Sequence, residues 1–130
     1  MRTSVWCSAH TPTEQQVQEL TSNFKSALVF LKNLNPELQE KLNNTPSEKE
    51  ELVKLAHELF NLMAHHCVDY IVQPGGSPAF QFVLGDIRER RGLGPQMLYA
   101  HSERVSIDQH QEDGSIVKTS VFKHVKFLNI

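Results

Sequence analysis

The stretch DYIVQPGGSPAFQFVLGDIRERRGLGPQMLYA, residues 69–100, holds a complete strand–helix–strand unit. Its runs 69–72 and 96–100 are short and apolar, as buried strands are, whereas 77–92 has the length of a helix and ends at Gly92. Two strands joined by a helix lie parallel in one sheet, and the connection between them is right-handed. The stretch therefore predicts a parallel sheet covered by helices.

The same alternation extends toward the N-terminus. Strands are predicted at residues 3–9 and 27–31, and helices at 11–20, 35–44 and 48–67. The last of these helices carries the clearest apolar stripe, formed by Leu52, Leu55, Leu59, Leu62 and Met63. Four strands separated by helices in 130 residues predict one α/β domain with a Rossmann-like, mostly parallel sheet flanked by helices. We assign residues 1–101 to this β/α core.

The remaining residues, 102–130, are predicted to form a C-terminal β-hairpin. Asp113–Gly114 is a typical two-residue hairpin turn between two strand-like segments. Both alternating faces of the second segment carry apolar side chains, namely Val121, Val125 and Phe127 on one and Phe122 and Leu128 on the other. One face would pack on its own domain and the other on a second copy, which predicts a homodimer. Alternatively, the hairpin only caps one edge of the sheet.

Composition limits the possible partners and the location of the protein. The formal net charge is −2, whereas proteins that coat long nucleic acids carry a basic excess. Any polyanionic ligand should therefore be small and held locally. No apolar run approaches the roughly 20 residues of a membrane span, and the first residues do not resemble a signal peptide. We expect a cytoplasmic protein without a membrane partner, in which Cys7 and Cys67 are buried free thiols.

Three polar segments follow predicted strands, at residues 8–14, 73–78 and 101–104. Ligands of open parallel sheets bind beyond the carboxyl ends of the strands, so these segments are candidates for one site. Two of them contain an N-cap followed by proline, Thr11–Pro12 and Ser77–Pro78, and Glu14 would complete a capping box with Thr11. Helix N-termini of this kind are natural seats for phosphate.

Other features of these segments refine the prediction. Thr45–Pro46–Ser47–Glu48 has the same capping chemistry without a preceding strand, so capping alone does not indicate a site. The pair Gly75–Gly76 would let a ligand approach the backbone closely. The glycine loop lacks the Lys–Ser/Thr ending of a Walker A motif and the GxGxxG spacing of dinucleotide sites, which disfavours ATPase and NAD-binding functions.

The third segment, HSER, supplies His101 and Ser102 as hydrogen-bonding groups and Arg104 as a fork for phosphate. Together with Ser8, His10 and Gln73 it would make the edge polar and poor in carboxylates. A magnesium site needs convergent carboxylates, and the spacing of His57, His65 and His66 does not form a compact zinc chelate. We therefore expect neither a metal nor another cofactor.

Four segments, in their order and spacing, resemble the small single-domain CRISPR-associated ring nucleases, relatives of the CARF (CRISPR-associated Rossmann fold) sensors. These segments are SAHTPTEQ, DYIVQPGG, LYAHSERVS and EDGSIVKTSVFKHVKF, and the resemblance covers almost the whole chain, although residues 33–68 match only as helices. It implies a homodimer that binds cyclic oligoadenylate, with the tetra-adenylate the expected ring. Such enzymes cleave the ring without a metal and so switch off type III CRISPR signalling.

The resemblance and the strand-end analysis together define the expected site. The expected ligand-binding residues are Ser8, Thr11, Thr13, Gln73, Gly75, Gly76, Ser77, Lys123 and His124, and the expected catalytic residues are His10, His101, Ser102 and Arg104. A ribose 2′-hydroxyl of the ligand would attack its own phosphate, with Arg104 stabilising charge and His10 or His101 transferring the proton. Arg104 could instead form a structural ion pair, the histidines could only contact ribose or base, and Lys123 and His124 could be plain strand residues. A binding protein that sequesters the ring, or a sensor subunit, remains the alternative to an enzyme.

Overall fold

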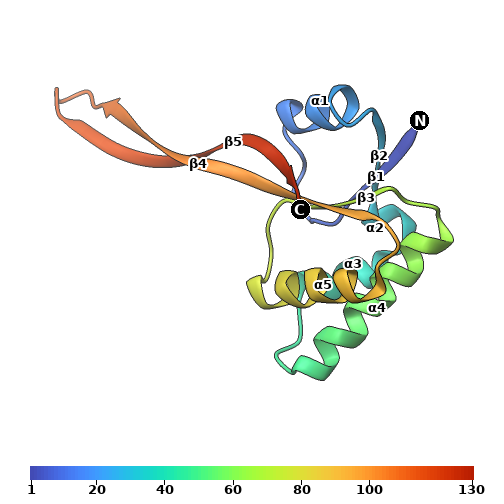
Figure 1. The fold of residues 1–130 in the computed structure, drawn as a ribbon. Coiled ribbons are helices and arrows are strands. Elements are labelled where there is room, and N and C mark those ends of the chain that lie inside the picture. Colours follow the sequence, from blue (N-terminus) through green and yellow to red (C-terminus); the bar gives the residue numbers. More distant parts are fainter.

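The computed structural model describes residues 1–130, which form one sheet with helices on both faces (Figure 1). The elements are β1 (Arg2–Trp6), α1 (Glu14–Ser22), β2 (Ser26–Phe30), α2 (Leu31–Leu34), α3 (Pro36–Asn43), α4 (Lys49–His65), β3 (Tyr70–Gln73), α5 (Pro78–Arg91), β4 (Gln96–His110) and β5 (Ile116–Asn129). The predicted α/β architecture, with its alternating strands and helices and its C-terminal hairpin, is confirmed.

The sheet is mixed, with strand order β2-β1-β3-β4-β5. The first four strands are parallel, and β5 runs antiparallel to β4. From β1 the chain passes outward to β2 on one side and later returns to β3 on the other. The order therefore reverses between β1 and β3, and the connections that leave these two strands separate there. A crevice at the carboxyl ends of such a strand pair is the usual ligand site in open α/β sheets.

The two faces of the sheet are covered by different helices. α1 lies on one face, and α2 to α5 lie on the other (Figure 1). Because successive side chains of a strand point to opposite faces, Val5 enters the larger core with Ile71 and Met97, whereas Trp6 enters the smaller one. The larger core also contains the α4 stripe, of which Leu52, Leu55, Leu59 and Met63 are buried as predicted. The smaller core consists of Trp6, Leu20, Tyr70, Val72, Leu98 and Phe127.

The caps of three helices differ in how well they follow the sequence. Ser77 caps α5 as predicted, with its Oγ accepting the Phe80 N–H at 3.3 Å. The cap of α1 is Thr13 rather than Thr11, because Thr13 forms a capping box with Gln16. Thr13 Oγ1 accepts the Gln16 N–H, and Gln16 Oε1 accepts the Thr13 N–H. Thr45 caps nothing, since α4 begins three residues later than the cap chemistry suggested and has no side-chain cap.

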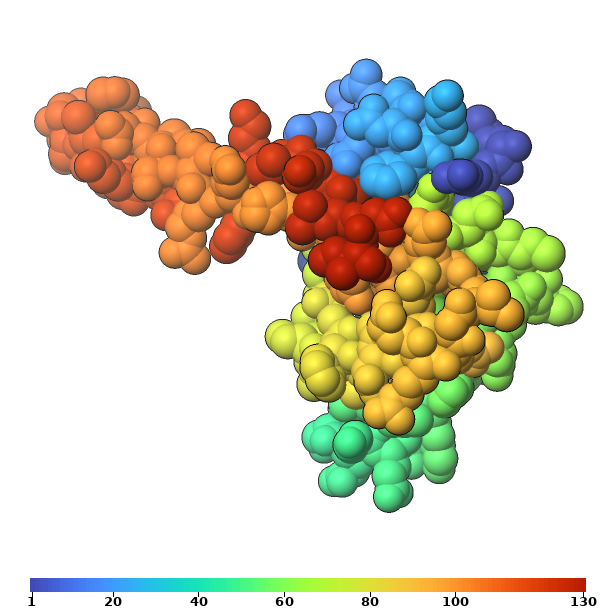
Figure 2. Space-filling model, viewed as in Figure 1, coloured from blue at the N-terminus to red at the C-terminus, as the bar shows by residue number.

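The fourth strand does not end at Ala100, as the polar segment after it suggested. β4 continues to His110 and pairs with β5 from Leu98 onward, with a bulge between His101 and Ser102. Beyond the pair Ser102–His124 the two strands leave the domain as a long two-stranded ribbon, which we call the arm and which comprises residues 103–123 (Figures 1 and 2). The segment at residues 101–104, whose sequence resembles a loop, is held extended by its antiparallel partner β5.

The turn at the tip of the arm is also longer than predicted. The Gln111 N–H donates to the Ser115 carbonyl at 2.8 Å, and the Gly114 N–H donates to the Gln111 carbonyl at 3.0 Å. Gly114 has a φ of 85°, so it occupies the left-handed position after the turn rather than its centre. The two hydrogen bonds from Ser115 to the Asp113 carboxylate lower the pKa of that exposed group.

Apolar side chains are exposed on both faces of the arm. Paired residues of an antiparallel ladder project to the same side, so Val105, Ile107, Val117, Thr119 and Val121 share one face. Phe122 on the opposite face is 72% exposed. The expectation that the domain itself would cover one face is wrong for the arm, although it is correct for Phe127 at its root. The homodimer stays a prediction.

One carboxylate ties the root of the arm to α1. Glu19 Oε2 accepts the Phe127 N–H at 2.6 Å, and Glu19 Oε1 lies 2.9 Å from His124 Nε2. His124 is buried and packs against the Phe127 ring, with a centroid distance of 4.7 Å. These contacts join α1 to β5 across the smaller core.

Glu19→Ala is expected to lower the free energy of unfolding by about 1–3 kcal/mol, because it leaves the Phe127 N–H and the buried His124 ring without their acceptor. Urea titration followed by circular dichroism measures this change. Gln18→Ala, at an exposed position of the same helix, is the control and should change stability by less than about 0.5 kcal/mol. Equal stability of the two variants would contradict a stabilising role for Glu19.

Candidate functional site

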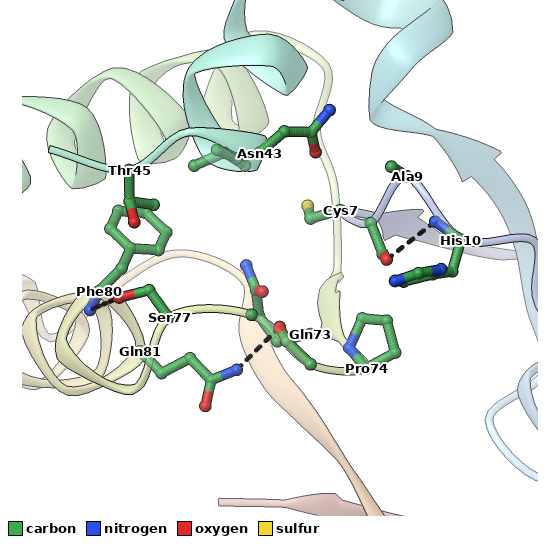
Figure 3. Close-up of a pocket in the computed structure, with 14 residues that line it drawn as sticks. Cys7, Ala9, His10, Asn43, Thr45, Gln73, Pro74, Ser77, Phe80 and Gln81 are labelled. Atoms are coloured by element: carbon green, nitrogen blue, oxygen red, sulfur yellow. Dashed lines mark hydrogen bonds between the residues drawn. The ribbon is translucent and has the colours of Figure 1, made fainter.

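A pocket of about 600 Å³ opens at the carboxyl ends of β1 and β3, where the strand order reverses (Figure 3). Three chain segments form it. They supply Cys7, Ser8, Ala9 and His10 from the loop after β1, Gln73, Pro74, Gly75, Gly76, Ser77, Phe80 and Gln81 from the end of β3 and the start of α5, and Leu42, Asn43 and Thr45 from the end of α3 and the connection that follows. Of the expected site residues, Ser8, His10, Gln73, Gly75, Gly76 and Ser77 meet here.

The loop after β1 is held in place by hydrogen bonds at both ends. The Cys7 N–H donates to the Val72 carbonyl at 3.1 Å, which extends the β1–β3 pairing by one residue. The Trp6 indole N–H donates to the His10 carbonyl at 2.8 Å, and the His10 N–H donates to Ser8 Oγ at 3.1 Å. The loop backbone is therefore fixed while the exposed His10 ring stands at the mouth of the pocket.

The loop after β3 is closed by a side chain of the following helix. Gln81 Nε2 donates to the Gly75 carbonyl at 2.9 Å, and Gly76 has a φ of 117°, which only glycine adopts without strain. At the helix start, Pro78 has no N–H, the Phe80 N–H is bound by Ser77 Oγ, and the Gln81 N–H is bound by the Ser77 carbonyl. Two N–H groups at the start of α5, those of Phe80 and Gln81, are therefore already used.

The third wall of the pocket was missed by the sequence analysis. Asn43 ends α3, and Thr45 follows in the connection to α4, so both reach the pocket from a part of the chain far from either strand end. The one sequence feature that points to this wall is the Thr45–Pro46 dipeptide, whose capping chemistry alone does not indicate a site. Thr45 proves to be a pocket residue that does not cap a helix.

The pocket is polar but carries little charge. Its lining contains no lysine or arginine, and His10 is its one side chain that can become a cation. Burial raises the pKa of the Cys7 thiol to about 12, so this group stays neutral at physiological pH. Gln73 is 5% exposed, and its Nε2 has no hydrogen-bond partner. Figure 3 shows the Gln73 amide directed into the space between Asn43 and Ser77.

The other expected site residues lie outside this pocket. His101, Ser102, Arg104 and Lys123 are exposed residues of the hairpin, and the Arg104 guanidinium lies 5.2 Å from the centroid of the Phe122 ring. His124, expected to contact ligand, is buried against Glu19 instead. Thr11 and Thr13 precede α1 and do not line the pocket. Within a single chain, the cationic and the pocket residues form two separate groups.

The two cysteines are expected to react very differently with alkylating reagents. With a pKa of about 12, only about one Cys7 thiol in 10⁴ is ionised at pH 8. Cys67, by contrast, is exposed, so the prediction that it is buried is wrong. Iodoacetamide at pH 8 should therefore label Cys67 alone, and denaturant should be needed for a second label. Intact-mass spectrometry over time measures this, and rapid labelling of Cys7 in the native protein would contradict its burial.

No group of three His, Cys, Asp or Glu side chains is arranged to hold a metal ion. None of the helices combines the length and the apolar character that crossing a membrane requires.

Comparison with known proteins gives one result that places the chain in a family. No curated protein and no solved structure matches it significantly. One family model, described as the uncharacterized protein MJ1673 family, matches residues 2–128, which include all the strands and helices that build the pocket. The chain therefore belongs to the uncharacterized protein MJ1673 family.

Proposed function

We propose that this protein is a metal-independent ring nuclease that opens cyclic oligoadenylate, with cyclic tetra-adenylate as its expected substrate. The observation that carries the proposal is the pocket between β1 and β3. It brings together residues 8–10 and 73–76, which belong to two of the four segments that resemble ring nucleases, at the sheet edge where α/β folds bind ligands. On this proposal the domain is of the Rossmann-like CARF type, and it acts in the cytoplasm, where type III CRISPR signalling takes place.

The proposed active form is a homodimer. A pocket of about 600 Å³ falls within the usual range for small-molecule sites but is small for a whole tetranucleotide ring, so two pockets related by a two-fold axis would share it. The exposed apolar faces of the arm support self-association, because an isolated two-stranded ribbon is marginal in water. In this dimer the arm of one copy would bring Arg104 and Lys123 to the pocket edge of the other.

The proposed reaction is an internal attack within the ligand. A ribose 2′-oxygen forms a bond to the adjacent phosphorus while the bond from phosphorus to the 5′-oxygen breaks, which leaves a 2′,3′-cyclic phosphate and a 5′-hydroxyl. His10 at the mouth of the pocket, or His101, accepts the 2′-hydroxyl proton, and the other histidine or the solvent gives a proton to the leaving 5′-oxygen. Arg104 stabilises the charge on the phosphate. Ser8, Ser77 and Ser102 orient the ligand. Positioning can supply about 7–11 kcal/mol in ideal intramolecular reactions, and one fixed donor about 3–4 kcal/mol.

A binding protein that holds the ring without cleaving it, as a sponge or a sensor subunit, is the second candidate. The observation that favours it is the absence of lysine and arginine from the pocket lining of the single chain. Such a protein would use the same pocket and would not need the arm to supply charge.

The test is a single-turnover experiment with excess protein and cyclic tetra-adenylate in EDTA, with the products resolved by chromatography and mass spectrometry. Linear or half-ring products ending in 2′,3′-cyclic phosphate are expected. Intact ring that elutes with the protein would support the binding alternative. Neither binding nor cleavage of the tri-, tetra- and hexa-adenylate rings would remove both candidates.

A further inference from the structure

The chemistry of the pocket lining suits an uncharged polar group. Its polar side chains are amides and hydroxyls, including Asn43, Thr45, Gln73 and Ser77, and Leu42 and Phe80 add apolar surface. A buried phosphate is stabilised best by cations, and the pocket lining contains no lysine or arginine. The start of α5, which the sequence suggested as a phosphate seat, has already satisfied its Phe80 and Gln81 N–H groups.

Gln73 is the buried polar group that a ligand would satisfy. The side chain is 5% exposed, its Nε2 has no partner, and Figure 3 shows the amide directed into the pocket. Buried amides are almost always hydrogen-bonded in folded proteins, and Gln73 lines the pocket, so a ligand bound there can supply the missing partner. A glutamine amide presents an NH₂ donor group and a carbonyl acceptor side by side.

We infer that this pocket binds an adenine base, which Gln73 recognises, and that the phosphates of the ligand stay at its rim near His10. Glutamine pairs with adenine through two hydrogen bonds, from its N–H to N7 and from the N6 amino group to its oxygen. Guanine presents acceptors at both N7 and O6, so the glutamine oxygen would face another acceptor. The inference rests on the proposed function and deepens it, because it assigns the base specificity to a named residue.

The test uses AMP, GMP and 7-deaza-AMP as probes, because a single nucleotide matches the pocket and needs no cleavage. Each is titrated into ¹⁵N-labelled protein while the side-chain amide signal of Gln73 is followed by NMR. AMP is expected to shift that signal and to bind about tenfold or more tightly than GMP or 7-deaza-AMP, the latter lacking the N7 acceptor. Gln73→Met keeps the volume of the side chain, removes the amide and should bind all three nucleotides equally.

Gln15→Met, on the exposed surface of α1, is the matched control and should discriminate as the wild-type protein does. Equal binding of AMP, GMP and 7-deaza-AMP by the wild-type protein would overturn the inference without any variant. So would binding of AMP that leaves the Gln73 signal unmoved, or no binding of AMP.

The outcomes separate this inference from the proposed function. AMP discrimination through Gln73 by a protein that neither binds nor cleaves cyclic oligoadenylate would support the adenine pocket and remove the ring nuclease. Cleavage of the ring at the same rate by wild-type protein and by Gln73→Met, without discrimination among the nucleotides, would support the ring nuclease and remove the adenine pocket.

Discussion

On the proposed function, a variant in which Asn–Gly joins Glu103 directly to Lys123 is expected to fold normally, to be monomeric and to lose ring cleavage by a factor of about 10³ or more. The deletion removes the arm beyond a pair that already faces across the ladder, so a two-residue turn fits there. His124 and Phe127, which hold the root to α1, are kept. The activity loss follows because Arg104 and the proposed dimer contact are removed together.

Light scattering gives the mass, circular dichroism the fold, and single-turnover cleavage of cyclic tetra-adenylate the rate. Arg104→Ala in the intact arm isolates the charge and should cost about 10²–10³ in rate while the dimer persists. Arg90→Ala, which removes an exposed guanidinium paired with Asp86 on α5, is its control and should leave the rate unchanged. A monomeric armless variant with full activity would refute the proposed role of the second copy.

In the proposed reaction, His10→Ala is expected to slow cleavage by about 10²–10⁴, the usual contribution of a positioned proton acceptor, and to change ring affinity by much less. Its loop is fixed by the Trp6 and Ser8 hydrogen bonds, so the ring of His10 is the part that changes. His101→Ala should have the smaller effect, because His101 lies on β4 outside the pocket lining. His66→Ala, at an exposed helix end, is the control.

Single-turnover rates across pH 5–9 together with ring affinities measure both effects. A rate for His10→Ala within a factor of about three of wild type would exclude His10 as the proton acceptor, since general-base catalysis contributes about 10²–10⁴. In that case a larger loss in His101→Ala would transfer the role to the hairpin.

The features that the sequence predicted correctly depend on neighbouring residues. Ser77 is followed by Pro78 and a free helix start, so its cap and the glycine loop before it form from local chemistry. The apolar stripe of α4 likewise repeats within one helix. Local chemistry does not always identify the cap, because Thr11 and Thr13 are both candidates for the N-cap of α1. Thr13 is the cap because Gln16 lies three residues after it and completes the capping box.

The features that the sequence did not predict depend on distant partners. HSER is polar and resembles a loop, yet Lys123 and Phe122 pair with it and keep β4 extended. His124 has the sequence context of an exposed strand residue, but it is buried. Its ring is hydrogen-bonded to the carboxylate of Glu19, which lies more than a hundred residues earlier in the chain. Asn43 and Thr45 reach the pocket only through the packing of α3 beside the strand ends.

The long ribbon beyond the domain also bears on solubility. Past its root, both of its edges leave backbone N–H and C=O groups free to pair, and such edges template the addition of strands from other chains. Charged residues interrupt it at Glu103 opposite Lys123 and at Asp108 opposite Lys118. Charges of this kind act as gatekeepers against amyloid-like stacking. Because its edges are unpaired, the ribbon that would recognise a second copy is also the segment from which aggregation of this protein would start if these charges were removed.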